Sequence, residues 1–283
     1  MKPFFSRLLL ALTAVLALAN LAHADEAGPA LKARYQTLTD KLQHNAFNQP
    51  VYLESVQTSS NLKGDVYAVI DQPFATFAAA VNKPENWCDI LILHLNIKYC
   101  RAGASATDLL VYTGRKIEQP LKDAYKLQFA WHSDASSADY SKVSLQAGAG
   151  PMGTKDYHIV LESVPVDAGH TFIHLSYAYG FGVSARLAMQ TYLSTVGSDK
   201  EGFTEVDSKP VGGVRGLVER NTMRYYLAIA AYLKYPTSPD KRDTWWFDAT
   251  EHYPDQLHEV EKKDDYLTMK RNEYKRQQSA PDA

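Results

Sequence analysis

The sequence has little of several features that would place it in a familiar class. Only two of its 283 residues are cysteine, which excludes a disulfide-rich scaffold. Acidic residues outnumber basic ones by 32 to 30, so a broad basic surface for nucleic acid is excluded. After residue 24, no apolar run approaches the roughly 20 residues that a membrane-spanning helix needs. We therefore expect one large soluble domain, or one domain with helical extensions.

Familiar catalytic motifs are also missing. The segment Gly182–Arg186 begins like a nucleophile elbow but lacks the second glycine of G-x-S-x-G, and Ser184 more readily caps a following helix. The glycines between residues 148 and 153 lie between two predicted strands, so they indicate a hairpin turn and not a phosphate-binding loop. The sequence predicts no catalytic residue and no cofactor.

The histidines give no metal site. His170 and His174 are four residues apart in a predicted strand, where that spacing spans about 13 Å and prevents both from reaching one ion. His94 and His132 lie near predicted strand ends without an assignable acidic partner, and we interpret them as structural residues. No metal is expected.

The first 24 residues have the pattern of a secretory signal peptide. Lys2 and Arg7 form a positive head, Leu8–Leu21 is almost entirely apolar, and Ala22 and Ala24 are small residues at the two positions that a signal peptidase reads. A membrane anchor is the alternative, but the run is shorter than about 20 residues. We expect cleavage after Ala24 and export to a bacterial periplasm. Since two of the 30 basic residues are removed, 28 basic residues face 32 acidic ones, a net charge of −4.

The two cysteines, Cys88 and Cys100, both follow this leader. In an exported protein such a pair predicts a disulfide, with two buried free thiols as the alternative. A loop of this length would contribute roughly 3 kcal/mol of stability by chain entropy.

Apolar periodicity predicts the order of the elements. A helix is expected over 30–43, strands over 51–56 and 64–70, and two short helices over 74–81 and 83–90. A run of strand-like segments separated by turn residues follows, which indicates an antiparallel meander. These segments cover 94–100, 109–114, 125–132, 141–146, 157–163 and 171–179.

The last third changes to helical periodicity. Helices are expected over 184–196 and 213–235, with a strand-like piece at 202–206 between them. Aromatic residues at 245–247 predict an anchor on the domain, and the charged stretch 254–277 predicts a solvated helix that docks along the N-terminal one. The expected organisation is a signal peptide (1–24), an N-terminal helix (25–48), a ligand-binding domain (49–236) and a C-terminal extension (237–283).

This order of elements resembles the START-like (SRPBCC, helix-grip) superfamily over about residues 51–235. The residues that carry the resemblance are Gly64–Ile70 with Pro73-Phe74, Trp87-Cys88, and Gly216–Leu227. The resemblance implies an α+β fold in which a long C-terminal helix closes a curved antiparallel sheet, here with extra flanking helices. It also implies a deep, mostly apolar cavity. Members bind lipids, sterols and other hydrophobic molecules, and some catalyse cyclisation or hydrolysis.

Candidate ligand-binding residues follow from placing the long helix over the sheet. They are Tyr112, Trp131, His174 and Tyr177 on the strands, and Leu217, Asn221, Arg224 and Tyr225 on the helix. Core packing is the alternative for each aromatic residue. Arg224 belongs to a charged cluster with Arg215, Glu219 and Arg220. That cluster is either a solvated face with weak ion pairs or places a cation at the cavity mouth.

The interpretation that best fits these features is a periplasmic carrier for a hydrophobic ligand, most simply a lipid. Its partners would be a hydrophobic small molecule and, transiently, a membrane, but not nucleic acid. The alternatives are a cyclase- or hydrolase-type enzyme that uses the same cavity, and a non-catalytic interaction protein with a filled core.

Overall fold

The computed structural model describes residues 26–183, 186–187, 191, 201–258, 260 and 262–279. The predicted signal peptide, Ser184 and most of the predicted helix 184–196 lie outside these residues. Within the part described, no helix has the length and apolar character needed to cross a bilayer.

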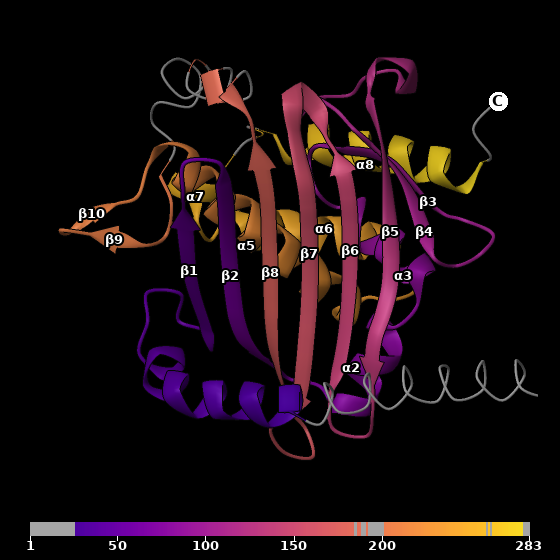
Figure 1. Cartoon of the computed structure of the whole chain (residues 1–283). Helices are drawn as coiled ribbons and strands as arrows, with labels where there is room; N and C mark the ends of the chain where they lie inside the picture. Colours follow the sequence, from indigo (N-terminus) through magenta and orange to yellow (C-terminus); the bar gives the residue numbers. More distant parts are fainter. Residues whose placement is uncertain are drawn as a thin grey trace, which may run out of the picture.

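The core of the fold is one antiparallel sheet of eight strands (Figure 1). The chain forms β1 (Val51–Gln57), β2 (Asn61–Ile70), β3 (Ile97–Ala102), β4 (Asp108–Thr113), β5 (Tyr125–Ser136), β6 (Ser141–Ala149), β7 (Thr154–Pro165) and β8 (Thr171–Phe181). The spatial order is β1-β2-β8-β7-β6-β5-β4-β3. Strands β3 to β8 therefore form the predicted meander, and β2 pairs with β8 to join the first hairpin to its end.

Helices occupy both faces of this sheet. An N-terminal helix spans residues 26–43, and α2 (Phe74–Val81) and α3 (Pro84–Leu91) connect β2 to β3. The other helices are α5 (Gly213–Lys234), α6 (Pro239–Thr250), α7 (Pro254–Leu257) and α8 (Lys263–Gln278). Two short 3₁₀ turns, η1 (Leu121–Asp123) and η2 (Pro151–Gly153), and a small hairpin of β9 (Glu205–Val206) and β10 (Lys209–Pro210) complete the fold. The predicted strand at 202–206 is thus confined to its last two residues.

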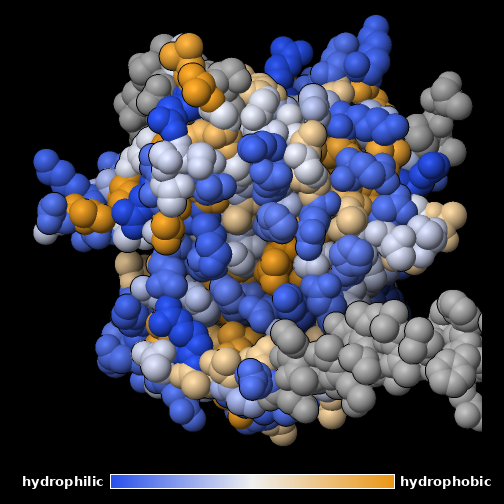
Figure 2. Space-filling model, viewed as in Figure 1, coloured by the Kyte–Doolittle hydropathy of each residue, from blue (hydrophilic) through white to orange (hydrophobic). Residues whose placement is uncertain are grey.

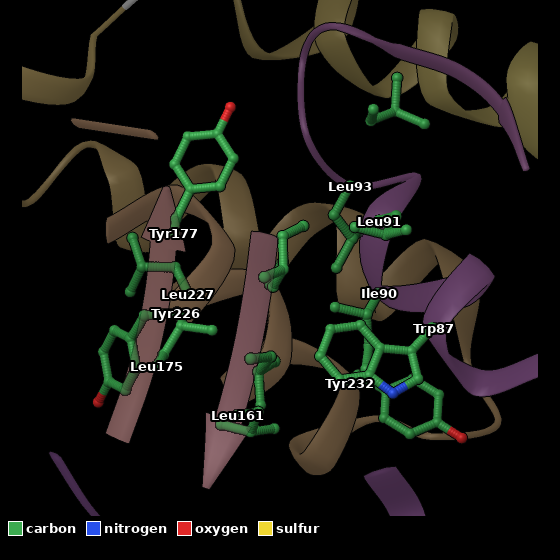
Figure 3. Packing of buried hydrophobic residues seen from close by; sticks show 14 of the residues in the cluster. Trp87, Ile90, Leu91, Leu93, Leu161, Leu175, Tyr177, Tyr226, Leu227 and Tyr232 are labelled. Carbon is green, nitrogen blue, oxygen red and sulfur yellow. The ribbon is translucent and has the colours of Figure 1, made fainter. Parts of the chain in front are cut away.

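The long helix α5 lies across the inner face of the sheet and packs on β1, β2 and β8. Gly64 in β2 permits this close approach, because a Cβ there would collide with the Thr222 hydroxyl of α5. On the same face of the sheet, Trp87, Ile90 and Leu91 of α3 pack in one core with Leu161 and Leu175 of the strands (Figure 3). The structure confirms the α+β helix-grip architecture.

The disulfide expected between Cys88 and Cys100 is present. It joins α3 to β3, so it links the helix pair to the first strand of the meander. Both residues are buried in the main apolar core.

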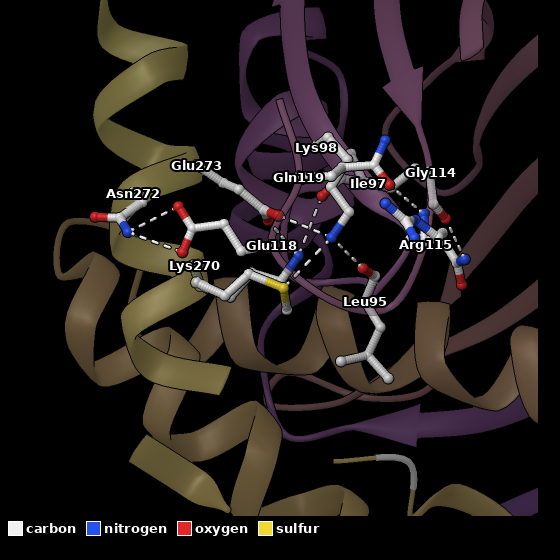
Figure 4. A network of polar contacts seen from close by, with 12 residues as sticks. Leu95, Ile97, Lys98, Gly114, Arg115, Glu118, Gln119, Lys270, Asn272 and Glu273 are labelled. Carbon is white, nitrogen blue, oxygen red and sulfur yellow. Dashed lines mark hydrogen bonds and ion pairs between the residues drawn. The ribbon is translucent and has the colours of Figure 1, made fainter. Parts of the chain in front are cut away.

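The C-terminal extension differs from the prediction. The aromatic anchor is the helix α6, which buries Trp246 and Phe247. The charged stretch is interrupted and forms α7 and α8, and α8 packs on β3 and α6 instead of on the N-terminal helix. The physical reason is that Lys270 and Glu273, which read as solvated residues in the sequence, are fully buried in an ion cluster with Lys98 of β3 (Figure 4).

The N-terminal helix packs on the opposite, outer face of the sheet. Its Leu31, Leu38 and Leu42 form a second apolar cluster with Tyr67 of β2 and Phe172 of β8. Apart from this covered strip, the outer face seen in Figure 2 is largely hydrophilic. The main apolar surface of the sheet therefore faces α3 and α5.

Candidate functional site

A cavity of about 670 Å³ lies between the inner face of the sheet and α5. This volume falls within the usual range of roughly 300–1,000 Å³ for small-molecule sites. Its apolar and aromatic lining comes from Leu91, Ile97, Val111, Leu127, Phe129, Tyr157, Ile159, Tyr177, Tyr179, Leu217 and Tyr225. Its polar lining comes from His94, Asn96, Thr113, Arg115, Lys116, Thr154 and Asn221.

The mouth of the cavity lies between the β4–β5 loop and the β6–β7 turn, because Arg115 and Met152 line the cavity and are also exposed. Asn96 fixes the start of the β4–β5 loop: its side chain donates a 2.7 Å hydrogen bond to the carbonyl of Gly114. The far end of the loop is tied to α8, where the Asn272 amide donates to Glu118 at 3.0 Å (Figure 4). Helix α8 therefore helps to position the cavity mouth.

Five aromatic rings form a continuous row on the side of the cavity where α5 meets β8. The row runs from His94 to Tyr225, Tyr177, Tyr179 and Tyr157, with ring centroids separated in turn by 4.8, 5.2, 5.6 and 5.3 Å. These separations are in the range of stabilising aromatic pairs. We call this row the aromatic ladder.

His94 is the only titratable ring in the ladder besides the phenols. It lies in the turn between α3 and β3 and is only 3% exposed. Burial lowers the pKa of His94 well below its usual value, and the positive charges of Arg224, Lys270 and Lys116 lower it further. The side chain of Asn221 lies beside the ring and acts in the opposite direction, raising the pKa of His94 by less than the other groups lower it. Its position does not give Nε2 of His94 a hydrogen-bond partner.

The structure brings four of the predicted ligand-binding residues together at this cavity. Leu217, Asn221 and Tyr225 are spaced four apart on α5, which places them on one face of the helix, and Tyr177 lies opposite on β8. Whether they contact a ligand remains a prediction.

Tyr112 and Trp131 do not line the cavity. Tyr112 alternates with Val111 and Thr113, so it points to the other side of β4 and packs edge-on against Tyr99 at 5.8 Å. Trp131 shares the inner side of β5 with cavity residues, but it is packed in the apolar core beyond the lining.

Arg224 is also outside the lining, although it is fully buried. It faces α6 and α7: its guanidinium donates to the Leu257 carbonyl at 3.3 Å, and the Trp246 indole donates to the backbone carbonyl of Arg224. The rest of the charged cluster fits neither expected alternative. Glu219 is buried and accepts hydrogen bonds from the Ser55 hydroxyl and from the Phe203 and Thr204 amides, so it anchors the segment that precedes α5.

His174 lies on the outer face of the sheet, because it alternates with the inward-facing Leu175 and Tyr177. Its Nε2 is 2.8 Å from an oxygen of Asp65, and its Nδ1 is 3.0 Å from an oxygen of Glu162. The ring also stacks on Tyr67 at 4.4 Å. His174 therefore joins three strands beneath the N-terminal helix and cannot reach the cavity.

The pKa values in this outer cluster predict a pH dependence of stability. Burial alone would lower the pKa of His174, but hydrogen bonds to Asp65 and Glu162 outweigh it and raise the pKa. A raised histidine pKa stabilises the fold fully below about 6.5, the unfolded value, and this contribution is lost as pH rises through the folded value. We expect wild-type stability to fall as the pH rises above about 6.5 and the His174→Gln variant to lack this part of the decline. The difference at pH 6 should be about 1.5–3 kcal/mol by urea unfolding.

An exposed histidine serves as the control for that measurement. His132 is on β5 and exposed, so His132→Gln should leave the pH profile of the wild type unchanged. If His174→Gln kept the full decline, the ion cluster would not be its source.

Several lining residues were not selected from the sequence. His94 is a lone histidine after a short helix, and Tyr157, Arg115 and Met152 border turns. A sharper signal existed for Tyr157, because it lies two residues before the apolar Ile159 on the same strand face. Among the residues described, no three histidine, cysteine or acidic side chains gather as metal ligands would.

No protein-family model matches the chain, and no curated protein matches it in sequence. Solved structures are similar to it in general shape. Norcoclaurine synthase from Thalictrum flavum, in complex with dopamine and hydroxybenzaldehyde, is 11% identical with a TM-score of 0.38, over 66% of this chain and 90% of that one. A conserved protein from Geobacillus kaustophilus is 10% identical with a TM-score of 0.37, over 61% and 95%. A conserved protein of unknown function from Enterococcus faecalis is 7% identical with a TM-score of 0.34, over 85% and 96%.

Proposed function

We propose that this protein binds and carries a hydrophobic small molecule, a lipid in the broad sense, in the periplasm. The observation that carries the proposal is the cavity of about 670 Å³ between sheet and α5, lined mainly by apolar and aromatic side chains and open at one end. Burial of apolar ligand surface in such a site contributes about 25 cal/mol per Å² before the costs of association.

The mouth supports transient contact with a membrane as the route of ligand entry. Met152 is 71% exposed at the rim, and Ile117 on the neighbouring loop is 57% exposed. Basic residues Arg115 and Lys116 lie beside them. Apolar tips next to basic side chains suit a surface of lipid headgroups over acyl chains.

Co-purification tests the proposal directly. The protein is isolated from periplasm without detergent and analysed by native mass spectrometry, followed by organic extraction. A bound hydrophobic molecule that is released by extraction is the expected result. A bare chain that also takes up nothing when a total lipid extract is added would contradict the carrier function.

Filling the cavity from α5 should block binding. Leu217 projects into the cavity from a partly exposed position, so Leu217→Trp adds volume without burying a polar group. Overpacking costs about 1–3 kcal/mol, which corresponds to ligand binding weakened by about fivefold or more. Fluorescence titration measures the effect. Val206→Trp in the exposed β9–β10 hairpin is the control and should bind as the wild type does. Unchanged uptake by Leu217→Trp would show that α5 does not cover the binding site.

A further inference from the structure

We infer that the cavity ligand is a flat ring compound that carries an anionic oxygen group, such as a polycyclic or aromatic carboxylate. Its ring faces would lie along the aromatic ladder, and its oxygen would accept a hydrogen bond from Nε2 of His94. The inference rests on the proposed function of the cavity as a ligand site, and it specifies the chemical class of that ligand.

The ladder favours a ring over a saturated chain. Tyr157 and Tyr179 stack nearly parallel, at 13° between their planes, while Tyr177 is tilted by 46° to Tyr179 and by 57° to Tyr225. The wall therefore offers both ring faces and ring edges. Aromatic surfaces gain from offset or edge contacts with another π system, beyond the gain from area alone.

The phenol hydroxyls of the ladder also favour a ring compound as the ligand. Tyr157 donates to Thr154 at 2.8 Å, whereas no hydrogen bond among the residues described involves the hydroxyl of Tyr177, Tyr179 or Tyr225. Burial raises the pKa of each of these three phenols, so they stay neutral and can donate. A plain acyl chain would leave these hydroxyls unpaired, whereas a ring compound with oxygen substituents would satisfy them.

His94 supplies a donor with a fixed orientation. The backbone N–H of Asn96 donates a hydrogen bond to Nδ1 of His94 at 3.3 Å. The Lys270 ammonium donates another to the backbone carbonyl of His94 at 2.8 Å. Since a neutral imidazole that accepts at Nδ1 carries its proton on Nε2, the Nε2–H is a donor. That atom is buried at the cavity and has no partner among the residues described. A hydrogen-bond acceptor on the ligand would satisfy this Nε2–H donor.

The charges around His94 favour an anionic acceptor. The cavity lining contains Arg115 and Lys116 but no aspartate or glutamate. Behind His94, Lys98 and Lys270 share one carboxylate, that of Glu273, at 2.8 and 2.7 Å. Among the residues described, the charged side chains that line the cavity or lie behind His94 are therefore mainly basic, which favours a carboxylate over an alcohol or an amine.

Three fluorescent or competing probes test the class. Anthracene-2-carboxylate has the ring and the charge, anthracene-2-methanol has the ring without the charge, and dodecanoate has the charge without the ring. Fluorescence anisotropy, with dodecanoate measured by competition, should give at least tenfold tighter binding for anthracene-2-carboxylate than for either other probe.

Two variants separate the ring from the donor. His94→Phe keeps the stack on Tyr225 and removes the donor, so it should weaken the carboxylate at least tenfold and the alcohol less than threefold. Tyr179→Leu removes a central ring and should weaken both anthracenes fivefold or more while leaving dodecanoate unchanged. Tyr112→Phe, outside the cavity, is the matched control and should change nothing. Each variant is first checked for wild-type unfolding.

The outcomes distinguish this inference from the proposed function. Equal or tighter binding of dodecanoate, unaffected by His94→Phe, would overturn the ring-and-anion inference and leave a lipid carrier. Binding of none of the three probes, together with an empty protein from periplasm, would overturn the carrier function as well.

Discussion

Replacing Glu273 with glutamine is expected to lower the free energy of unfolding by about 3–5 kcal/mol. The Glu273 carboxylate is fully buried and is the shared partner of the Lys98 and Lys270 ammonium groups (Figure 4). Glutamine keeps the shape but removes the charge, so two ammonium groups are left in the interior without a counter-ion. Urea unfolding at pH 7 measures the loss. The control is Asp240→Asn. Asp240 of α6 forms an exposed ion pair with Arg271, which lies on α8 as Glu273 does, and its replacement should change stability by less than about 0.5 kcal/mol.

The same variant should show a characteristic pH dependence. Burial, followed by the charge of Lys270, lowers the pKa of Lys98 to about 8 in the wild type. Since the unfolded lysine titrates near 10.4, the native state releases its proton first, and stability rises with pH between these two values. Without the Glu273 charge, this rise should begin at a lower pH. A loss below 1 kcal/mol at pH 7, or an unchanged pH profile, would mean that the ion cluster does not hold α8 on β3.

Removing the disulfide by Cys88→Ala with Cys100→Ala should lower the free energy of unfolding by about 3 kcal/mol. The bridge closes a loop of sequence separation 12 between α3 and β3, and its main effect is to restrict the unfolded chain. Alanine avoids placing hydroxyl groups in the apolar core. Urea unfolding of the oxidised wild type and of the double variant gives the difference.

A reductant provides the internal control for this measurement. It should destabilise the wild type to nearly the level of the double variant and leave the double variant unchanged. Equal stability of oxidised and reduced wild type would indicate that the bridge does not restrict the chain in solution.

The sequence was most informative where one face of an element is apolar. The meander and α5 could be predicted because their apolar residues recur with periods of two and of three to four. The same argument placed Leu217, Asn221 and Tyr225 on one face of α5, and all three line the cavity.

The sequence was least informative where both faces are covered. On β8, Phe172 and His174 are packed under the N-terminal helix while Ile173 and Leu175 are in the main core, so no alternation reveals which side faces the cavity. Lys270 and Glu273 present the opposite difficulty. Charged residues on a helix usually indicate a solvated face, and only the distant Lys98 of β3 makes their burial possible.

The link from Lys270 to the carbonyl of His94 has a consequence for the order of events during synthesis. Most of the cavity wall is built from the middle of the chain, but the lining residue His94 is held in place by a helix that ends at residue 278. Under the proposed carrier function, a ligand can therefore meet a correctly placed His94 only after the chain as far as α8 has folded. A change that displaces α8 should disturb the placing of His94, whereas a change confined to the N-terminal helix, on the opposite face of the sheet, should leave it unaffected.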